Sequence, residues 1–427
     1  MLFRVLAAFA IVVSSAPATQ AQLRGHGGPV RALAISPDGR TALSGSFDTS
    51  AIRWSLERNA AMQVLRFHNG AVNAVALLPD GRLVTSGEDA RIAIWMPGAA
   101  QPARVLEGHT APVVALAVSP DGRMLASASW DRTARLWSLD GGDVRVLEGH
   151  GDNVNGVAFT PDGRAVLTAG YDATLRVWPL TGGGAPAVVA LPAALNSVAV
   201  APDGEIAAGG ADGALYLRAP DGADRARVEV AQMPLIAVAV SPDGRLIAAA
   251  GIRGSVAIVE RPTRKLVRTL VGPGLPVWSA AFFPDSRTLL TGGTDRMIRR
   301  WDAVTGEPIG DTIMGAPKDP LAAYAGDPGA EVFRACVACH TLNENDGVRA
   351  GPTLAGIFGR KIASLPGYNF SEALKRLDIV WTPETVAKLF EVGPAQYTPG
   401  TKMPEQTIGS TADREALVRF LEKTTRK

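Results

Sequence analysis

A Pro-Asp pair recurs seven times along the chain at nearly constant spacing. The prolines are Pro37, Pro79, Pro120, Pro161, Pro202, Pro242 and Pro284, separated by 42, 41, 41, 41, 40 and 42 residues. Gly follows the pair in six copies, and proline, aspartate and glycine together specify a tight turn. Short apolar runs flank each turn, as at 113–118 and 124–127, so each unit contains a β-hairpin. A period of about 40 residues with Gly-His near its start and Trp near its end indicates a four-stranded propeller blade.

Four polar or aromatic side chains recur at fixed offsets inside the units. His26 is followed by Ser44, Asp48 and Trp54, and the units that begin at His68, His109 and His150 repeat this order. These units, for example GHTAPVVALAVSPDGRMLASASWDRTARLW from Gly108, resemble the WD-repeat family. The resemblance implies a seven-bladed propeller that acts as an interaction platform. It also implies a buried chain of hydrogen bonds from Trp through Ser or Thr and His to Asp. A catalytic Ser-His-Asp site is disfavoured, because four near-identical copies on separate blades cannot all be active sites.

Three units depart from this pattern. The unit at 191–220 has Arg218 in place of Trp, the unit at 232–262 has Arg253 and Val259 in place of Asp and Trp, and the last unit has Pro273 in place of His. We expect these blades to be less rigid or to depend more on apolar packing. Because few mature residues precede Gly25, we expect residues 308–314, and not the N-terminus, to form the outer strand of the last blade.

Residues 1–21 have the pattern of a secretory signal peptide. Arg4 precedes an apolar core at 5–13, and small residues follow it up to Ala21. An uncleaved membrane anchor is the alternative. No later stretch approaches the ~20 apolar residues of a membrane span. We therefore expect an exported mature protein without a membrane span, located in the periplasm if the source is a Gram-negative bacterium.

The net charge and the distribution of lysines limit the possible partners and the position of the domain boundary. The formal net charge of +2 disfavours a nucleic-acid partner. Lys265 is the only lysine before residue 318. The increase in lysine content after this point coincides with a stretch rich in Gly, Pro and Ala. We expect an all-β seven-bladed propeller at 22–314, a linker at 315–325 and an all-α domain at 326–427.

The all-α domain contains the sequence Cys336-Val337-Ala338-Cys339-His340, the attachment signature for c-type haem. Alone, this motif could be a redox dithiol or a chance match. Further motifs accompany it: Gly326-Asp327-Pro328 before it, Gly351-Pro352 and Gly359-Arg360 after it, then Gly367-Tyr368, Trp381 and Pro399-Gly400-Thr401-Lys402-Met403. Together they resemble class I cytochrome c, particularly the bacterial soluble carriers.

The resemblance implies one covalent haem c, attached through Cys336 and Cys339, with His340 and Met403 as axial ligands of the iron. It implies that the Pro352 carbonyl orients the imidazole and that Arg360, Tyr368, Trp381 and Thr401 bond the haem propionates. Ordinary core filling is the alternative for Tyr368 and Trp381. Mitochondrial relatives place a Tyr beside the Met sulfur, where this chain has Leu389 or Phe390. Lys361, Lys388 and Lys402 are candidates for a docking rim, or are simply solvated lysines.

These assignments account for all five His and both Cys. The leading hypothesis is an exported electron carrier, not an enzyme, whose propeller docks a redox partner protein. The alternative is a periplasmic dehydrogenase in which the propeller holds a substrate or second cofactor, and a third candidate is a redox sensor or assembly factor. The sequence leaves the oligomeric state, the redox partner and the potential open.

Overall fold

The structure is a computed structural model. It describes residues 22–182, 184–252, 254–271, 275–310, 321–334, 336–337, 339–344, 349, 351–368, 370–401, 403 and 407–425. The predicted signal peptide, most of the predicted linker, and the predictions for Arg253, Pro273 and Lys402 lie outside these residues. Within the described ranges, no helix has both the length and the apolar character needed to cross a bilayer.

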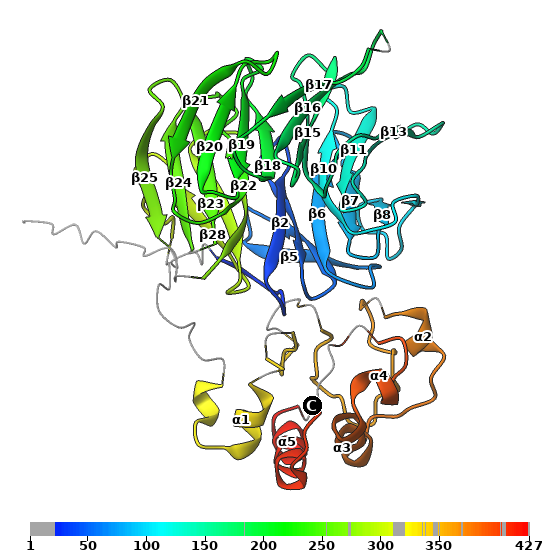
Figure 1. The fold of residues 1–427 in the computed structure, drawn as a ribbon. Coiled ribbons are helices and arrows are strands. Elements are labelled where there is room, and N and C mark those ends of the chain that lie inside the picture. The colour runs from blue at the N-terminus through cyan, green and yellow to red at the C-terminus, as the bar shows by residue number, and fades with distance from the viewer. Residues whose placement is uncertain are drawn as a thin grey trace, which may run out of the picture.

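The propeller contains seven four-stranded antiparallel sheets among the described residues, which confirms the predicted fold class (Figure 1). The first three blades, in chain order, are formed by β2 (Val30–Ile35), β3 (Thr41–Ser46), β4 (Ser50–Ser55) and β5 (Ala60–Arg66); β6 (Val72–Leu77), β7 (Leu83–Gly87), β8 (Ile92–Trp95) and β9 (Arg104–Leu106); and β10 (Val113–Val118), β11 (Met124–Ser129), β12 (Ala134–Ser138) and β13 (Arg145–Leu147).

The next three blades are formed by β14 (Val154–Phe159), β15 (Ala165–Gly170), β16 (Thr174–Pro179) and β17 (Ala187–Ala190); β18 (Leu195–Val200), β19 (Ile206–Gly210), β20 (Ala214–Arg218) and β21 (Asp224–Glu229); and β22 (Leu235–Val240), β23 (Leu246–Gly251), β24 (Ser255–Glu260) and β25 (Lys265–Val271). The last blade contains β26 (Val277–Phe282), β27 (Thr288–Gly293) and β28 (Met297–Asp302). The first strand of each repeat contacts those of the two neighbouring blades, and β2 contacts β26, so the ring is closed.

The expectation for the outer strand of the last blade is wrong. The N-terminal strand β1 (Leu23–Arg24) pairs with β28, with Leu23 opposite Ile298 and Arg24 opposite Met297. Leu23 is only 1% exposed. Pro308 forms an isolated bridge to Trp301, and its ring nitrogen has no hydrogen to donate to a ladder. The buried leucine therefore makes the N-terminus the closing strand. Of the residues that the structure describes after β28, Pro308 and Ile309 contact the far end of that strand, and the predicted residues 311–314 lie outside the described ranges.

The predicted hydrogen-bond chain is confirmed in all four blades that carry its residues. In the first blade, Trp54 Nε1 donates to Ser44 Oγ at 2.8 Å, His26 Nε2 lies 2.7 Å from the same oxygen, and His26 Nδ1 lies 3.0 Å from Asp48. Burial opposes ionisation of Asp48, but its bonds to His26, the Ser50 hydroxyl and the Gly27 amide outweigh burial and hold its pKa well below the usual range. Each chain thus joins two neighbouring strands of a blade, and the turn between them, to the segment that precedes the blade's first strand.

Two of the departing blades have substitute contacts. In the blade of β18–β21, the Tyr216 hydroxyl donates to Asp212 at 2.6 Å, and Arg227 pairs with the same carboxylate at 3.0 Å. In the last blade, Trp301 Nε1 donates to Thr291 at 2.9 Å, and Arg299 pairs with Asp295. These blades therefore lack the histidine but retain polar contacts to the aspartate of the turn, Asp212 in one blade and Asp295 in the other.

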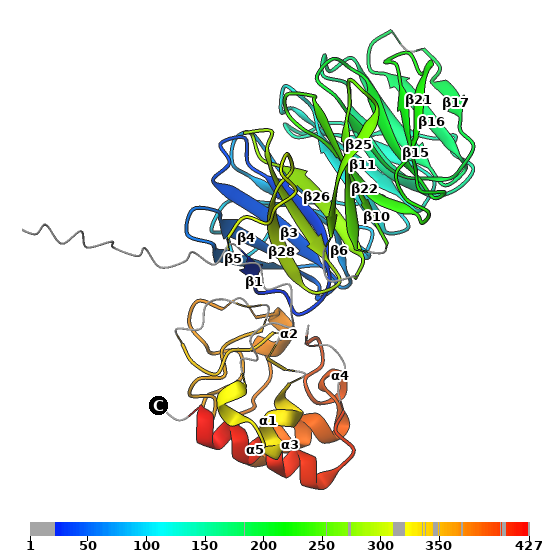
Figure 2. The ribbon, with the colours of Figure 1, turned by 90° about the vertical axis from the view of Figure 1, so that its left-hand side faces the viewer.

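The C-terminal domain is a small helical unit, as Figure 2 shows. It contains η1 (Ala322–Tyr324), α1 (Pro328–Phe333), α2 (Glu372–Lys375), α3 (Pro383–Val392), α4 (Pro394–Tyr397) and α5 (Thr411–Thr424). The Asp327 carboxylate caps α1, a Thr382–Thr385 capping box begins α3, and Ser410 caps α5. Helices α1 and α3 both pack on α5, through apolar residues that include Phe333, Phe390 and Phe420.

Removing the shared hydroxyl of one brace should destabilise the propeller. Ser127 is fully buried, accepts from Trp137 Nε1 at 2.8 Å and bonds His109 Nε2 at 2.8 Å. Ser127→Ala leaves both groups without a partner, so we expect a loss of about 2 kcal/mol in the free energy of unfolding. Urea denaturation followed by far-UV circular dichroism measures it. Ser279→Ala is the control, because that buried hydroxyl has no partner, and an equal loss in both variants would contradict the assignment.

The closing role of β1 has its own test. Leu23→Ala should lower the free energy of unfolding by about 3 kcal/mol, because it removes a buried side chain from the seam between the last blade and the N-terminus. Ile309→Ala should cost less than about 1 kcal/mol, since this side chain is 37% exposed. The reverse order in the same denaturation assay would show that the chain after β28 closes the ring.

Candidate functional site

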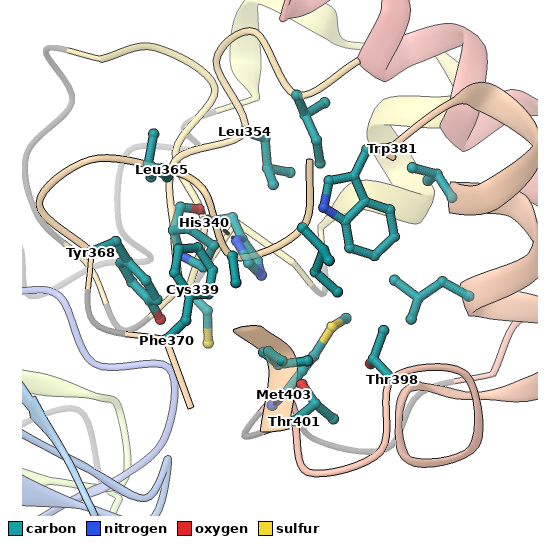
Figure 3. A pocket seen from close by; sticks show the side chains of 18 of the residues that line it. Cys339, His340, Leu354, Leu365, Tyr368, Phe370, Trp381, Thr398, Thr401 and Met403 are labelled. Atoms are coloured by element: carbon teal, nitrogen blue, oxygen red, sulfur yellow. Dashed lines mark hydrogen bonds between the residues drawn. The ribbon is translucent and has the colours of Figure 1, made fainter. Parts of the chain in front are cut away.

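All nine side chains predicted to hold the haem line one cavity: Cys336, Cys339, His340, Pro352, Arg360, Tyr368, Trp381, Thr401 and Met403. Figure 3 shows the cavity and labels those of Cys339, His340, Tyr368, Trp381, Thr401 and Met403. The nine residues come from the segment after α1, the loops between α1 and α3, and the loop between α4 and α5. The remaining wall is mostly apolar and includes Phe333, Leu354 and Leu417. Tertiary folding therefore brings together residues that span 68 positions of the sequence, from 336 to 403.

The His340 ring is held in a defined orientation. Its Nδ1 donates a hydrogen bond to the Pro352 carbonyl at 2.8 Å, because a carbonyl oxygen can only accept. This bond leaves Nε2 with its lone pair available. Burial lowers the pKa of His340, so the neutral imidazole, the form that binds a metal, is favoured. Gly351 makes room for the ring, since a Cβ there would lie 2.5 Å from His340 Cε1.

Cys336 and Cys339 lie on the same turn as His340, and they do not form a disulfide with each other. The Cys339 and His340 amides donate to the Cys336 carbonyl at 3.0 and 2.9 Å, which presents the three side chains from one compact loop. Burial raises the pKa of Cys336 to about 12 and that of Cys339 to about 11. The cavity therefore holds two uncharged sulfurs beside one neutral imidazole.

Met403 enters the cavity from a different segment than His340 does (Figure 3). Its amide donates to Thr401 Oγ1 at 3.1 Å, and the Ser371 hydroxyl donates to the Gly400 carbonyl at 2.8 Å. Gly400 has a φ of +81°, and a Cβ there would lie 2.3 Å from Ala373 Cβ. The methionine loop is thus attached to the start of α2, and only glycine fits at the point of contact.

Arg360 and Trp381 are neighbours at the cavity wall. The Trp381 amide donates to the Arg360 carbonyl at 3.0 Å, and the Gly359 amide donates to the Trp381 carbonyl at 2.8 Å. The Arg360 guanidinium donates to the carbonyls of Thr353 and Ala355, and burial lowers its pKa. Burial also raises the pKa of Tyr368 to about 12. The proposed propionate contacts of these residues stay predictions.

Two of the candidate rim lysines are paired with neighbouring carboxylates. Lys361 lies 2.8 Å from Asp378, and Lys388 lies 2.9 Å from Glu391. All four side chains are well exposed, and exposed pairs of this kind are worth little energetically. The contacts are those of ordinary solvated lysines, so they give no separate support to a docking rim.

Two cavity residues come from the propeller, and sequence reasoning missed both. Asp48 and Arg66 of the first blade line the same cavity, and the Arg66 guanidinium lies 4.9 Å from the centroid of the Tyr368 ring. The sequence pattern placed Asp48 only in the hydrogen-bond chain of its blade, and no pattern assigned a role to Arg66. No local pattern could have found them, because the contact is made by residues about 300 positions apart.

The residues of the cavity fit a c-type haem. Two thiols, an imidazole whose free nitrogen is Nε2, and a thioether are the donors that such a group requires. Apolar walls and the half-buried Arg360 suit a macrocycle that carries carboxylates on one edge. The donor set thus supports a single haem site made almost entirely by the C-terminal domain.

The two parts of the chain match two different protein families. The family model "WD domain, G-beta repeat" matches residues 18–55, 60–96, 100–138, 141–179 and 264–302. The matched segments leave out β18–β21 and most of β22–β25, two of the three blades that depart from the repeat pattern. The N-terminal region is therefore a WD-repeat propeller, as the resemblance implied.

The family model "Cytochrome c" matches residues 326–425. Over 99 residues, the chain is 40% identical to cytochrome c of Cochliobolus lunatus and of Arabidopsis thaliana, covering 23% of this chain and 91% and 88% of those proteins. It is 37% identical over 117 residues to all of cytochrome c of Theileria annulata, covering 27% of this chain. These matches imply a covalently bound haem c and support an electron-transfer haem protein. Through its C-terminal domain, the chain belongs to the cytochrome c family.

Proposed function

We propose that the protein is an exported electron carrier in which His340 and Met403 ligate the iron of one haem c and the propeller docks a redox partner. One observation carries the proposal. An imidazole oriented by the Pro352 carbonyl and a methionine thioether line the same apolar cavity as the two thiols of the attachment motif. A bound haem c supplies reversible one-electron chemistry at its iron.

His340 and Met403 would hold the iron of a bound haem c and would determine its reactivity. The hydrogen bond from Nδ1 to Pro352 raises the basicity of the His340 ring and fixes its plane. The Met403 thioether is a soft ligand, which favours the reduced iron and raises the potential. If both residues hold the iron of a bound haem, no position would remain there for a substrate. This favours electron transfer over substrate chemistry at the iron itself.

Polar residues at the cavity wall would neutralise the carboxylate edge of the haem. Arg360 keeps its charge in a half-buried position next to Trp381, while Tyr368 remains un-ionised at neutral pH. Thr401 already accepts the Met403 amide, and its hydroxyl hydrogen remains to be donated. These groups therefore combine two tasks, since they hold the haem and shape the loop of the axial methionine.

Exposed aromatic side chains on the propeller support a docking role. Phe47, Trp130 and Tyr171 each directly precede the aspartate of a hydrogen-bond chain, and they are 44%, 44% and 48% exposed. Because their position in the blade is equivalent, they lie on the same end of the propeller. Aromatic residues are enriched in protein–protein interfaces, where they supply large contact areas at low entropic cost. We infer that a redox protein docks on this end, and that residues 1–21 direct export to the periplasm.

The axial role of Met403 can be tested in the haem-loaded protein. Met403→Ala removes the thioether, so we expect the ferric haem to change from low-spin and six-coordinate to high-spin and the midpoint potential to fall. Visible spectroscopy combined with a redox titration measures both. Met96→Ala is the control, because Met96 is 50% exposed in the propeller. A high-spin wild-type protein, or an unchanged spectrum in Met403→Ala, would eliminate this ligand assignment.

The docking surface can be tested by kinetics. Trp130→Ala combined with Tyr171→Ala should slow haem reduction by a periplasmic and membrane extract of the source cells by roughly tenfold, while the midpoint potential stays the same. Stopped-flow absorbance measures the rate at several extract concentrations. Val188→Ala, which truncates a 52% exposed side chain of β17, is the control. Equal rates in all variants would show that the partner does not use this end of the propeller.

A further inference from the structure

The last residue of strand β5 in the first blade has a side chain that lines the haem cavity. This residue, Arg66, places the guanidinium face over the Tyr368 ring, with Cζ 4.9 Å from the ring centroid. Both side chains line the cavity that holds His340 and Met403. Figure 2 shows the same blade directly beside the C-terminal domain. Arg66 of the propeller therefore lies within the cofactor site of the other domain.

The Arg66 guanidinium is incompletely satisfied. Its Nη2 is buried and has no hydrogen-bond partner, and among the described residues no carboxylate lies within ion-pair distance of it. A buried cation without a counter-charge is unfavourable, so such a group is normally found beside an anion. The planar guanidinium is well suited to pair with a carboxylate.

Asp48 does not serve as that anion. It lines the same cavity, but its oxygens already accept from His26, the Gly27 amide and both the amide and hydroxyl of Ser50. The adjoining segment is also tightly fitted, because a Cβ on Gly27 would lie 1.8 Å from Cys339 Sγ. The first blade thus forms one wall of the cavity. Its Arg66 guanidinium, which has no counter-charge in the described part of the chain, faces the space in which the haem would bind.

We propose that Arg66 belongs to the haem site and pairs with a propionate carboxylate of the haem, so that the propeller helps to set the haem potential. This inference rests on the covalent haem and not on the docking role or the axial methionine. Arg66 lies beside Tyr368, which the family resemblance already associates with a propionate. Among the described residues, the other charged groups at this part of the site are Asp48 and Arg296 of the propeller and Arg349, Arg360, Lys361 and Glu344 of the C-terminal domain, where Glu344 acts on Arg360.

The test uses the full-length haem-loaded protein and its Arg66→Gln, Arg66→Lys and Arg58→Gln variants. Arg58 is exposed and lies before the start of β5, roughly 20 Å from Arg66 along the strand, so it controls for net charge. Removing a cation near the haem favours the oxidised iron. At a fixed ambient potential, the ratio of reduced to oxidised haem should fall roughly threefold in Arg66→Gln, remain close to wild type in Arg66→Lys and be unchanged in Arg58→Gln.

The pH profile of the midpoint potential distinguishes a propionate partner from a purely structural role. Arg66 should keep the carboxylate ionised, so in Arg66→Gln the carboxylate should protonate at a higher pH, and the rise of potential on acidification should begin at a higher pH. If Arg66→Gln fails to incorporate haem, Arg66→Lys should restore incorporation. A wild-type potential and pH profile in Arg66→Gln, or failure of both variants to incorporate haem, would overturn the proposal. Failure of the axial assignment would instead appear as a high-spin wild-type spectrum.

Discussion

The hydrogen bond from His340 Nδ1 to the Pro352 carbonyl is the constraint on which the haem site depends. It determines which imidazole nitrogen is available to the iron, and it connects the attachment motif to the loop that carries Arg360. Gly351 makes this bond possible because any larger side chain would collide with the ring. A second loop, held to the start of α2 by Ser371 and Gly400, brings Met403 to the same cavity. The site is therefore built from two loops that are each fixed by one backbone carbonyl.

The propeller is stabilised by hydrogen bonds between buried side chains within its blades. Four blades contain a buried chain of Trp, Ser or Thr, His and Asp, whose members satisfy one another inside an apolar sheet stack. The blade of β18–β21 replaces it with a tyrosine and an arginine around Asp212, and the last blade keeps only its Trp301–Thr291 end and pairs Asp295 with an arginine. Closure of the ring then depends on two residues of the N-terminus, where Leu23 is buried between the last blade and the first.

The first blade of the propeller packs closely against the haem site of the C-terminal domain. Gly27 and Arg66 lie on a blade whose internal hydrogen bonds hold Asp48 and its turn in place, so the brace that stabilises the blade also shapes one wall of the haem cavity. The Cys339 side of the site faces the propeller. A propeller in this position can influence the haem electrostatically as well as provide a docking surface.

Local sequence patterns determined most of this protein. The Pro-Asp period specified seven hairpin units, and the offsets of His, Ser, Asp and Trp specified their internal bonds, because turns and buried polar chains impose strict spacing. The attachment motif, Gly351-Pro352 and Met403 likewise identified the residues that line the cavity. The tertiary structure alone decided the closing strand, the substitute contacts of Tyr216 and Arg299, and the entry of Arg66 into the haem site. Each of these depends on contacts between distant segments, whose energy comes from burial and charge in three dimensions and leaves no periodic trace in the sequence.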